Sequence, residues 1–190
     1  MSSQCLVTVI SRVLAKPFVI ENHYTQAMGK ASIILGLWRE STLVGVITFG
    51  QPSGRLVASS LGHTEQTCFE FLRMVVLDSE VTSRTYFMGQ SIKILRQKFP
   101  KVKMLVTYAD QTEGHTGTVY KAGSWELHGY TAKKYHYLTP DGSRLNKRIP
   151  WDNAKKLGIT EKEYVTKMEY IKVMEKPKIR FIKRIRGKKE

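Results

Sequence analysis

Three polar segments of the sequence carry residue types that can bind a ligand or move a proton. Asn22–Tyr24 (NHY) joins an imidazole to a phenol, Glu70–Arg73 places an acid and a guanidinium in an apolar run, and Glu113–Tyr120 (EGHTGTVY) sets two glycines beside a histidine. Histidine and carboxyl groups transfer protons, arginine holds carboxylates or phosphates, and paired glycines allow a backbone to approach a ligand closely. Each segment also fits a structural role: a surface loop, an internal ion pair, or a capped turn entering a helix.

Two further segments lie where predicted elements begin or end. Tyr108–Asp110 ends a strand, which is where α/β sheets commonly bind ligands, although Asp110 would equally cap a helix. Ser83–Ser91 opens a helix whose free N–H groups and dipole suit a pyrophosphate or phosphodiester, although ordinary capping by Ser83 explains the same residues. We expect four residues of these segments to gather at one edge of the sheet: Arg73, Asp110, His115 and Tyr120.

A mixed α/β sheet is predicted to position these residues. Apolar or alternating runs predict six strands, which are Cys5–Ile10, Ser32–Trp38, Leu43–Phe49, Cys68–Val76, Lys103–Tyr108 and Tyr135–Leu138. The break at Glu40–Thr42 predicts an antiparallel hairpin, whereas the helix Thr85–Phe99 between two strands predicts a parallel crossover. Gly114–Ala122 is a second, shorter helix candidate. The expected fold class is therefore α/β, with a mostly antiparallel sheet and flanking helices.

The character of the sequence changes after Pro140. A turn at Asp141–Gly142 precedes two predicted short helices, Asp152–Leu157 and Thr160–Met168, and a basic segment follows them. We therefore expect a catalytic core over residues 1–140 and a basic extension over residues 141–190 that packs on the same domain.

Composition excludes several classes of protein. The chain has 190 residues, of which 42% are hydrophobic and 25% charged, so it can bury a core and is not disordered as a whole. No stretch approaches the roughly 20 apolar residues of a membrane span, and the N-terminus lacks the basic start of a signal peptide, which predicts a cytoplasmic protein. Cys5 and Cys68 have no nearby cysteine, so neither a disulfide framework nor a cysteine zinc site is indicated.

Positive charge is the strongest signal in the composition. Lysine and arginine number 31 against 16 acidic residues, a formal net charge of +15, which favours a polyanionic partner such as nucleic acid. The last fifteen residues, KPKIRFIKRIRGKKE, are the most basic, and a solvated tail or an edge strand with Ile179 and Phe181 buried are the alternatives. The predicted DNA contacts are Lys178, Arg180, Lys183, Arg184 and Arg186.

The sequence resembles two nested groups of proteins. The order of strand, helix, strand and helix from Cys68 to Tyr130 is similar to the core of the GNAT acetyltransferase superfamily, in which two parallel strands splay apart around an acyl-coenzyme A arm. Within that superfamily, the motifs NHY, LVGVITFGQPSG, FEFLRMVV, MGQSIKIL and YADQTEGHTGTVYKAGSWELHGYT resemble the Mom family of phage Mu-type DNA-modification proteins. The resemblance covers about residues 20–140.

The resemblance implies transfer of a carbamoylmethyl group to N6 of adenine in DNA, which protects phage DNA from restriction. It places Arg73, Asp110 and Tyr120 on functional positions, with His23 and Tyr24 on the family's His–Tyr pair. Tyr120 would be the general acid, Asp110 would orient or deprotonate N6, and Arg73 would hold the donor. Because N6 is engaged in base pairing, the adenine is expected to flip out. The ring of Trp125, Tyr86 or Phe87 is expected to stack on it.

The resemblance also implies an acyl-coenzyme A or related donor. The residues expected to hold it are Val75, Ser83, Arg84, Gly89 and Ser91. The segment Arg84–Gly89 lacks the first glycine of the superfamily pattern Q/R-x-x-G-x-G/A, and Tyr86 or Phe87 would crowd that position. The donor therefore stays open.

Iron is associated with Mom-type proteins, which makes His23 and His115 candidate ligands, with Asp110 as a third. Two other functions fit the same residues. One is a GNAT N-acetyltransferase acting on a protein or small amine, and the other is a non-catalytic DNA-binding protein on a GNAT fold.

Overall fold

The computed structural model describes residues 5–77 and 84–185 of the chain. These residues divide into two compact units. The first unit contains residues 5–77, 84–108, 117–129 and 180–185, and the second contains residues 109–116 and 130–179. No helix among the described residues is long and apolar enough to cross a membrane.

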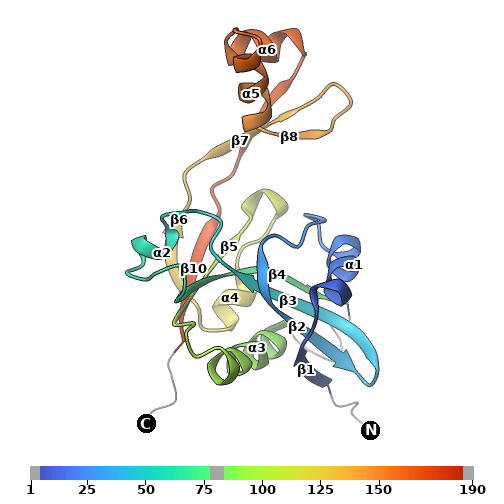
Figure 1. Cartoon of the computed structure of the whole chain (residues 1–190), viewed down its shortest axis with the longest axis vertical. Helices are drawn as coiled ribbons and strands as arrows, with labels where there is room; N and C mark the ends of the chain where they lie inside the picture. Colours follow the sequence, from blue (N-terminus) through green and yellow to red (C-terminus); the bar gives the residue numbers. More distant parts are fainter. Residues whose placement is uncertain (1–4, 78–83, 186–190) are drawn as a thin grey trace. The chain divides into compact units, whose positions relative to one another are not determined.

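A seven-stranded sheet runs through the first unit (Figure 1). Its strands, in spatial order, are β1 (Cys5–Val9), β2 (Ala31–Arg39), β3 (Thr42–Gly50), β4 (Cys68–Val76), β5 (Met104–Ala109), β10 (Ile179–Arg184) and β6 (Glu126–Tyr130). The pairs from β1 to β4 are antiparallel, whereas β4 and β5 are parallel. The predicted fold class, hairpin and parallel crossover are therefore confirmed.

The parallel strands β4 and β5 pair over only part of their length. Their register joins Cys68 to Met104, Phe69 to Leu105 and Glu70 to Val106. β4 then continues to Val76 with β3 as its neighbour, and β5 continues to Ala109. The two strands therefore stop pairing in mid-course, as expected for a splayed pair.

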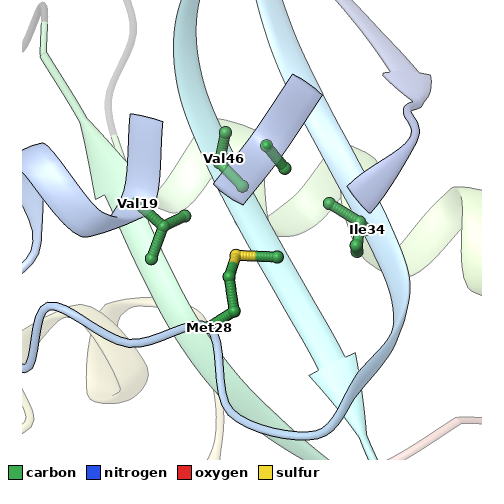
Figure 2. Close-up of a cluster of buried hydrophobic side chains, with 5 residues drawn as sticks. Val19, Met28, Ile34 and Val46 are labelled. Atoms are coloured by element: carbon green, nitrogen blue, oxygen red, sulfur yellow. The ribbon is translucent and has the colours of Figure 1, made fainter. Parts of the chain in front are cut away.

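Helices cover this sheet through apolar faces. α1 (Arg12–Asn22) begins at its cap Ser11 and contributes Ala15 and Val19 to a buried cluster with Met28, Ile34 and Val46, whose side chains converge in Figure 2. α3 (Arg84–Lys98) buries Met88, Ile92 and Leu95, whose spacing of four and three residues puts them on one face. The remaining short helices are α2 (Val57–Ser60), η1 (Gln111–Glu113) and α4 (Thr118–Ala122).

The basic C-terminal segment contains an interior strand. β10 lies between β5 and β6 in the sheet. Three residues of this strand are buried, Ile179, Phe181 and Ile182, and so is Ile185, which follows it. A solvated tail and an edge strand are both wrong for Ile179–Arg184. The apolar residues of this segment are therefore part of the core.

The second unit contains a small antiparallel sheet and two helices. The strand order is β8 (Arg144–Asn146), β7 (Lys134–Leu138), β9 (Ile171–Glu175), and the helices are α5 (Arg148–Lys156) and α6 (Glu161–Lys167). Thr160 and Glu163 form a capping box at the start of α6. α5 begins four residues before the predicted helix because Pro150 occupies its first turn, where proline is tolerated.

Candidate active site

Tyr120 is fixed by the turn that leads into α4. Gly117 caps the helix at φ +78°, and a Cβ added there would lie 2.3 Å from Cε2 of Phe181, so only glycine fits. The Tyr120 ring then packs against Phe71, Trp125 and Phe181 at centroid distances of 5.9, 5.5 and 5.5 Å. The glycine that the sequence associates with ligand approach thus serves packing of the core beside Tyr120.

The Tyr120 hydroxyl lies where β4 and β5 stop pairing. It hydrogen bonds with the side chain of Thr107, and Thr107 donates its proton to the carbonyl of Phe71 at 3.1 Å. Thr107 and Phe71 directly follow the last paired residues of their strands. Because the only hydroxyl proton of Thr107 is used on Phe71, neutral Tyr120 is the donor to Thr107.

Burial raises the pKa of Tyr120. Electrostatic interactions with Tyr24 and with Glu70 raise the pKa of Tyr120 further. Tyr120 therefore stays protonated at neutral pH, which is the state that a general acid requires.

Glu70 is a buried carboxylate, 8% exposed, near the start of the unpaired segment. It accepts the backbone N–H of Ser53 at 2.7 Å. Burial raises the pKa of Cys68 to about 11, with a smaller contribution from Glu70, and burial also raises the pKa of Tyr108, where Glu70 adds to the effect and Arg180 opposes it. Sequence reasoning paired Glu70 with Arg73 and did not assign it to the site.

Arg73 reaches a different partner. Its Nε donates to the carbonyl of Ala27 at 2.8 Å and its Nη1 to the carbonyl of Leu72 at 2.7 Å. The bond to Ala27 attaches the loop before β2 to β4. An ion pair between Arg73 and Glu70 is not found among the described residues. Holding the donor stays a prediction for this guanidinium.

The His–Tyr pair lies in that same loop. The His23 N–H ends α1 by donating to the carbonyl of Val19, and its Nδ1 accepts the N–H of Thr25 at 3.1 Å. The ring stacks on Tyr24 with a centroid distance of 4.5 Å, and Tyr24 is 51% exposed. Tyr24 and Tyr120 both belong to the first unit, and Tyr24 contributes to the raised pKa of Tyr120.

The described residues do not fit a metal centre. They contain no group of three or more histidine, cysteine, aspartate or glutamate side chains that could hold an ion. His23 and His115 belong to different units, and His115 is exposed. The expectation that the protein binds iron therefore has no support.

The residues predicted to hold the donor differ in exposure. Arg84 and Gly89 are exposed on α3, whereas Val75 and Ser91 are buried, and Ser83 lies outside the described residues. The Ser91 hydroxyl has no hydrogen-bond partner within the described part of the chain.

The two bulky residues at the start of α3 differ in exposure, and their crowding of the donor position stays a prediction. Phe87 is fully buried in the core, where a Cβ on Gly45 would approach its ring within 3.1 Å, and Tyr86 is 44% exposed. Trp125 is also buried. Of the three rings expected to stack on a flipped base, only Tyr86 is exposed.

Asp110 belongs to the second unit. Its side chain caps η1 through the N–H of Thr112 at 3.1 Å and pairs with Lys178 at 2.5 Å between Oδ2 and Nζ. Burial favours a raised pKa for Asp110, but the hydrogen bonds and charge of Lys178 and the N–H of Thr112 outweigh it, so the pKa falls below 3.8. Both predicted roles of Asp110, orienting N6 and deprotonating it, stay predictions.

Residues expected to converge are divided between the units. The His115 N–H donates to the carbonyl of Asp110 at 3.0 Å within the second unit. Arg73 and Tyr120 belong to the first unit. The convergence of all four residues stays a prediction.

Several predicted DNA contacts have internal partners. Lys178 pairs with Asp110, Arg180 hydrogen bonds with Tyr108, and Lys183 donates to the carbonyls of Gly123 at 2.6 Å and Ser124 at 3.2 Å. Burial, followed by the charge of Arg96, lowers the pKa of Lys183. Arg184 is exposed, and Arg186 lies outside the described residues. DNA binding by these residues stays a prediction.

A sheet with a partly paired parallel β4–β5 pair and a tyrosine at the point of separation defines the GNAT class of fold. A probable acetyltransferase from Staphylococcus epidermidis shares this fold with a TM-score of 0.53, 7% identity and coverage of 96% of this chain and 100% of that one. A GNAT family acetyltransferase from Elizabethkingia anophelis, solved with acetyl-CoA bound, matches with a TM-score of 0.50, 9% identity and coverage of 95% and 97%.

Within this class the chain belongs to the Mom protein family, which it matches over residues 4–189. It is 27% identical over 143 residues to the methylcarbamoylase mom of Escherichia phage Mu. That match covers 72% of this chain and 58% of the phage Mu protein, which is less than two thirds of the relative's length.

Proposed function

We propose that this protein modifies DNA by transferring a carbamoylmethyl group to N6 of adenine, in the cytoplasm of a bacterial host, from an acyl-coenzyme A-related donor whose leaving atom is bonded to the methylene carbon of that group. The observation that carries the proposal is the Tyr120 hydroxyl, which Thr107 anchors where β4 and β5 part in a chain of the Mom family. The phage Mu relative is named for methylcarbamoyl transfer, and a GNAT neighbour was solved with acetyl-CoA bound.

The reaction requires two proton movements. A bond forms between N6 and the transferred carbon while the bond from that carbon to the donor breaks; N6 loses a proton and the donor's leaving atom gains one. Tyr120 is protonated at neutral pH because its pKa is raised, so it is the proposed proton donor. Glu70 is the proposed proton acceptor, since it is a buried carboxylate whose charge reaches Tyr120.

The donor and the base impose separate demands on the site. Arg84 and Gly89, exposed on α3, suit the pyrophosphate of the donor, since arginine provides charge and the Gly89 Cβ position faces open space. The adenine must leave the duplex because its N6 is paired there, and extrusion of a base costs a few kcal/mol. The half-exposed ring of Tyr86 is the described residue that suits stacking on it.

Mass spectrometry of nucleosides tests the proposal directly. DNA from bacteria expressing the chain should contain deoxyadenosine carrying the mass of one carbamoylmethyl group. Tyr120→Phe should lower the yield at least ~100-fold, the lower range for loss of an acid–base group. Tyr130→Phe is the matched control, because Tyr130 is 62% exposed.

The outcomes separate the competing functions. Unmodified deoxyadenosine with an acetylated amine or protein would instead support a conventional acetyltransferase. Unmodified DNA that the protein still binds would support a non-catalytic role.

A further inference from the structure

One face of the small sheet in the second unit gathers lysines around a tyrosine. The β7–β9 register pairs Tyr135 with Met174 and Tyr137 with Lys172, so these side chains share a face. Lys172 Nζ lies 4.0 Å from the centroid of the Tyr135 ring, and Lys147 Nζ, from the turn after β8, lies 5.3 Å from it. We call Tyr135, Lys147, Lys172 and Met174 the tyrosine–lysine face.

The opposite face of the same sheet is built differently. There Glu175 accepts from Arg144 at 2.6 Å and lies 3.1 Å from His136 Nδ1, so an acid accompanies the basic groups. On the tyrosine–lysine face neither Lys147 nor Lys172 forms an ion pair within the described part of the chain. The ring attracts each ammonium group, but the two ammonium groups repel each other, and an external anion would relieve that repulsion.

The surroundings of this face are also basic and partly apolar. Residues 130–179 contain twelve lysines and arginines against six acidic residues, a net charge of +6. Met174 is 58% exposed on the face, and on α5 the half-exposed Trp151 has Lys155 Nζ 5.3 Å from its ring. Three of these cations have acidic partners: Lys178 pairs with Asp110, Arg144 with Glu175 and Arg148 with Asp152.

We propose that the tyrosine–lysine face binds the phosphate backbone of double-stranded DNA, an inference that rests on the proposed function. The two lysines lie against the ring and have no acidic partner among the residues that the structure describes, which suits contact with successive phosphates of one strand. Tyr135 is half-buried with an ammonium group 4.0 Å away, so it positions cations and does not offer its ring for base stacking. The contact therefore supplies affinity without reading sequence.

Salt-dependent binding of the full-length protein to a labelled duplex oligonucleotide tests this inference. Replacing both lysines in Lys147→Gln/Lys172→Gln should lower the slope of log affinity against log salt by about 1.8, since each lost phosphate contact removes about 0.9. At roughly 0.15 M ionic strength the affinity should fall several-fold. The matched control is Lys16→Gln/Lys93→Gln, which removes the same charge from two exposed lysines of the first unit and should leave the slope near the wild-type value.

A third variant separates the ring from the charge. Tyr135→Leu keeps both lysines but removes the ring, so it should weaken binding while changing the salt slope less than the double lysine variant. Equal slopes for the two double variants would overturn the inference, as would a wild-type protein that binds an acidic polypeptide and not duplex DNA.

Nucleoside analysis of the same proteins distinguishes the two proposals. A lower slope of log affinity against log salt in the Lys147→Gln/Lys172→Gln variant, with no adenine modification by the wild type, would support DNA docking and refute the proposed function. Wild-type modification that the variant retains, together with an unchanged slope, would refute docking alone.

Discussion

The ion pair between Asp110 and Lys178 predicts a large stability difference for a small substitution. Asp110→Asn keeps the shape of the side chain but leaves the Lys178 ammonium without its counter-ion. The two side chains are 9% and 32% exposed, so the pair lies between a surface pair, worth ~0–1 kcal/mol, and a buried one, whose breaking costs ~3–5 kcal/mol. We expect the free energy of unfolding to fall by ~1–3 kcal/mol.

The effect should depend on pH in a defined direction. The folded pKa of Asp110 lies below 3.8, whereas an unfolded aspartate titrates near ~3.9. A lowered folded pKa gives stability that is complete above the unfolded value and is lost as pH falls through the folded value. The difference between wild type and Asp110→Asn should therefore be constant at neutral pH and shrink below about pH 4.

Urea unfolding followed by circular dichroism measures this effect. The matched control is Asp152→Asn, because Asp152 pairs with Arg148 at 3.5 Å with both side chains exposed, and it should cost ~0–1 kcal/mol. In a double-mutant cycle, Lys178→Met should be less destabilising in the Asp110→Asn background than in the wild type. Equal costs for the two aspartate variants, or no coupling to Lys178, would refute the reasoning.

Three further predictions concern the supports of Tyr120. Thr107→Val removes the acceptor of the Tyr120 hydroxyl and the donor to the Phe71 carbonyl, so it should lower adenine modification and reduce the free energy of unfolding by ~1–3 kcal/mol, measured by nucleoside mass spectrometry and urea unfolding. Lys183→Met removes the cation at the end of α4 and should destabilise by ~0.3–2 kcal/mol, while duplex affinity measured by anisotropy stays within a few-fold. Gly117→Ala adds a left-handed strain of ~1–2 kcal/mol to the clash with Phe181 and should lower the melting temperature, whereas Gly142→Ala, also left-handed but open, should lower it less.

The strands with strong local patterns could be predicted from the sequence. The hairpin around Glu40–Thr42 and the β4–α3–β5 crossover follow from apolar runs broken by turn residues. β6, β8 and β9 were not predicted, because they are three to five residues long and mostly exposed, so they carry no apolar pattern of their own. Pairing with other strands fixes them, and pairing is not encoded locally.

The site shows the same division between local and distant information. Tyr120 could be found from its motif, but its partner Thr107 could not, because the Thr107 bond to Phe71 joins residues 36 positions apart through one register of β4 and β5. Gly117 likewise needs the ring of Phe181, which enters the core only because β10 is an interior strand. Both contacts depend on the completed sheet.

The position of β10 also decides how DNA binding can be tested. Truncation from Lys176 would remove the predicted DNA contacts of the basic segment, but it would also delete a strand that buries Ile179, Phe181 and Ile182 between β5 and β6. Losing that much apolar contact should unfold the first unit, so reduced DNA binding by the truncated chain would not identify a binding residue. The same residue types behave differently at Lys147 and Lys172, where substitution removes charge without removing core. Point substitutions on the small sheet therefore separate DNA affinity from folding, and truncation of the basic segment does not.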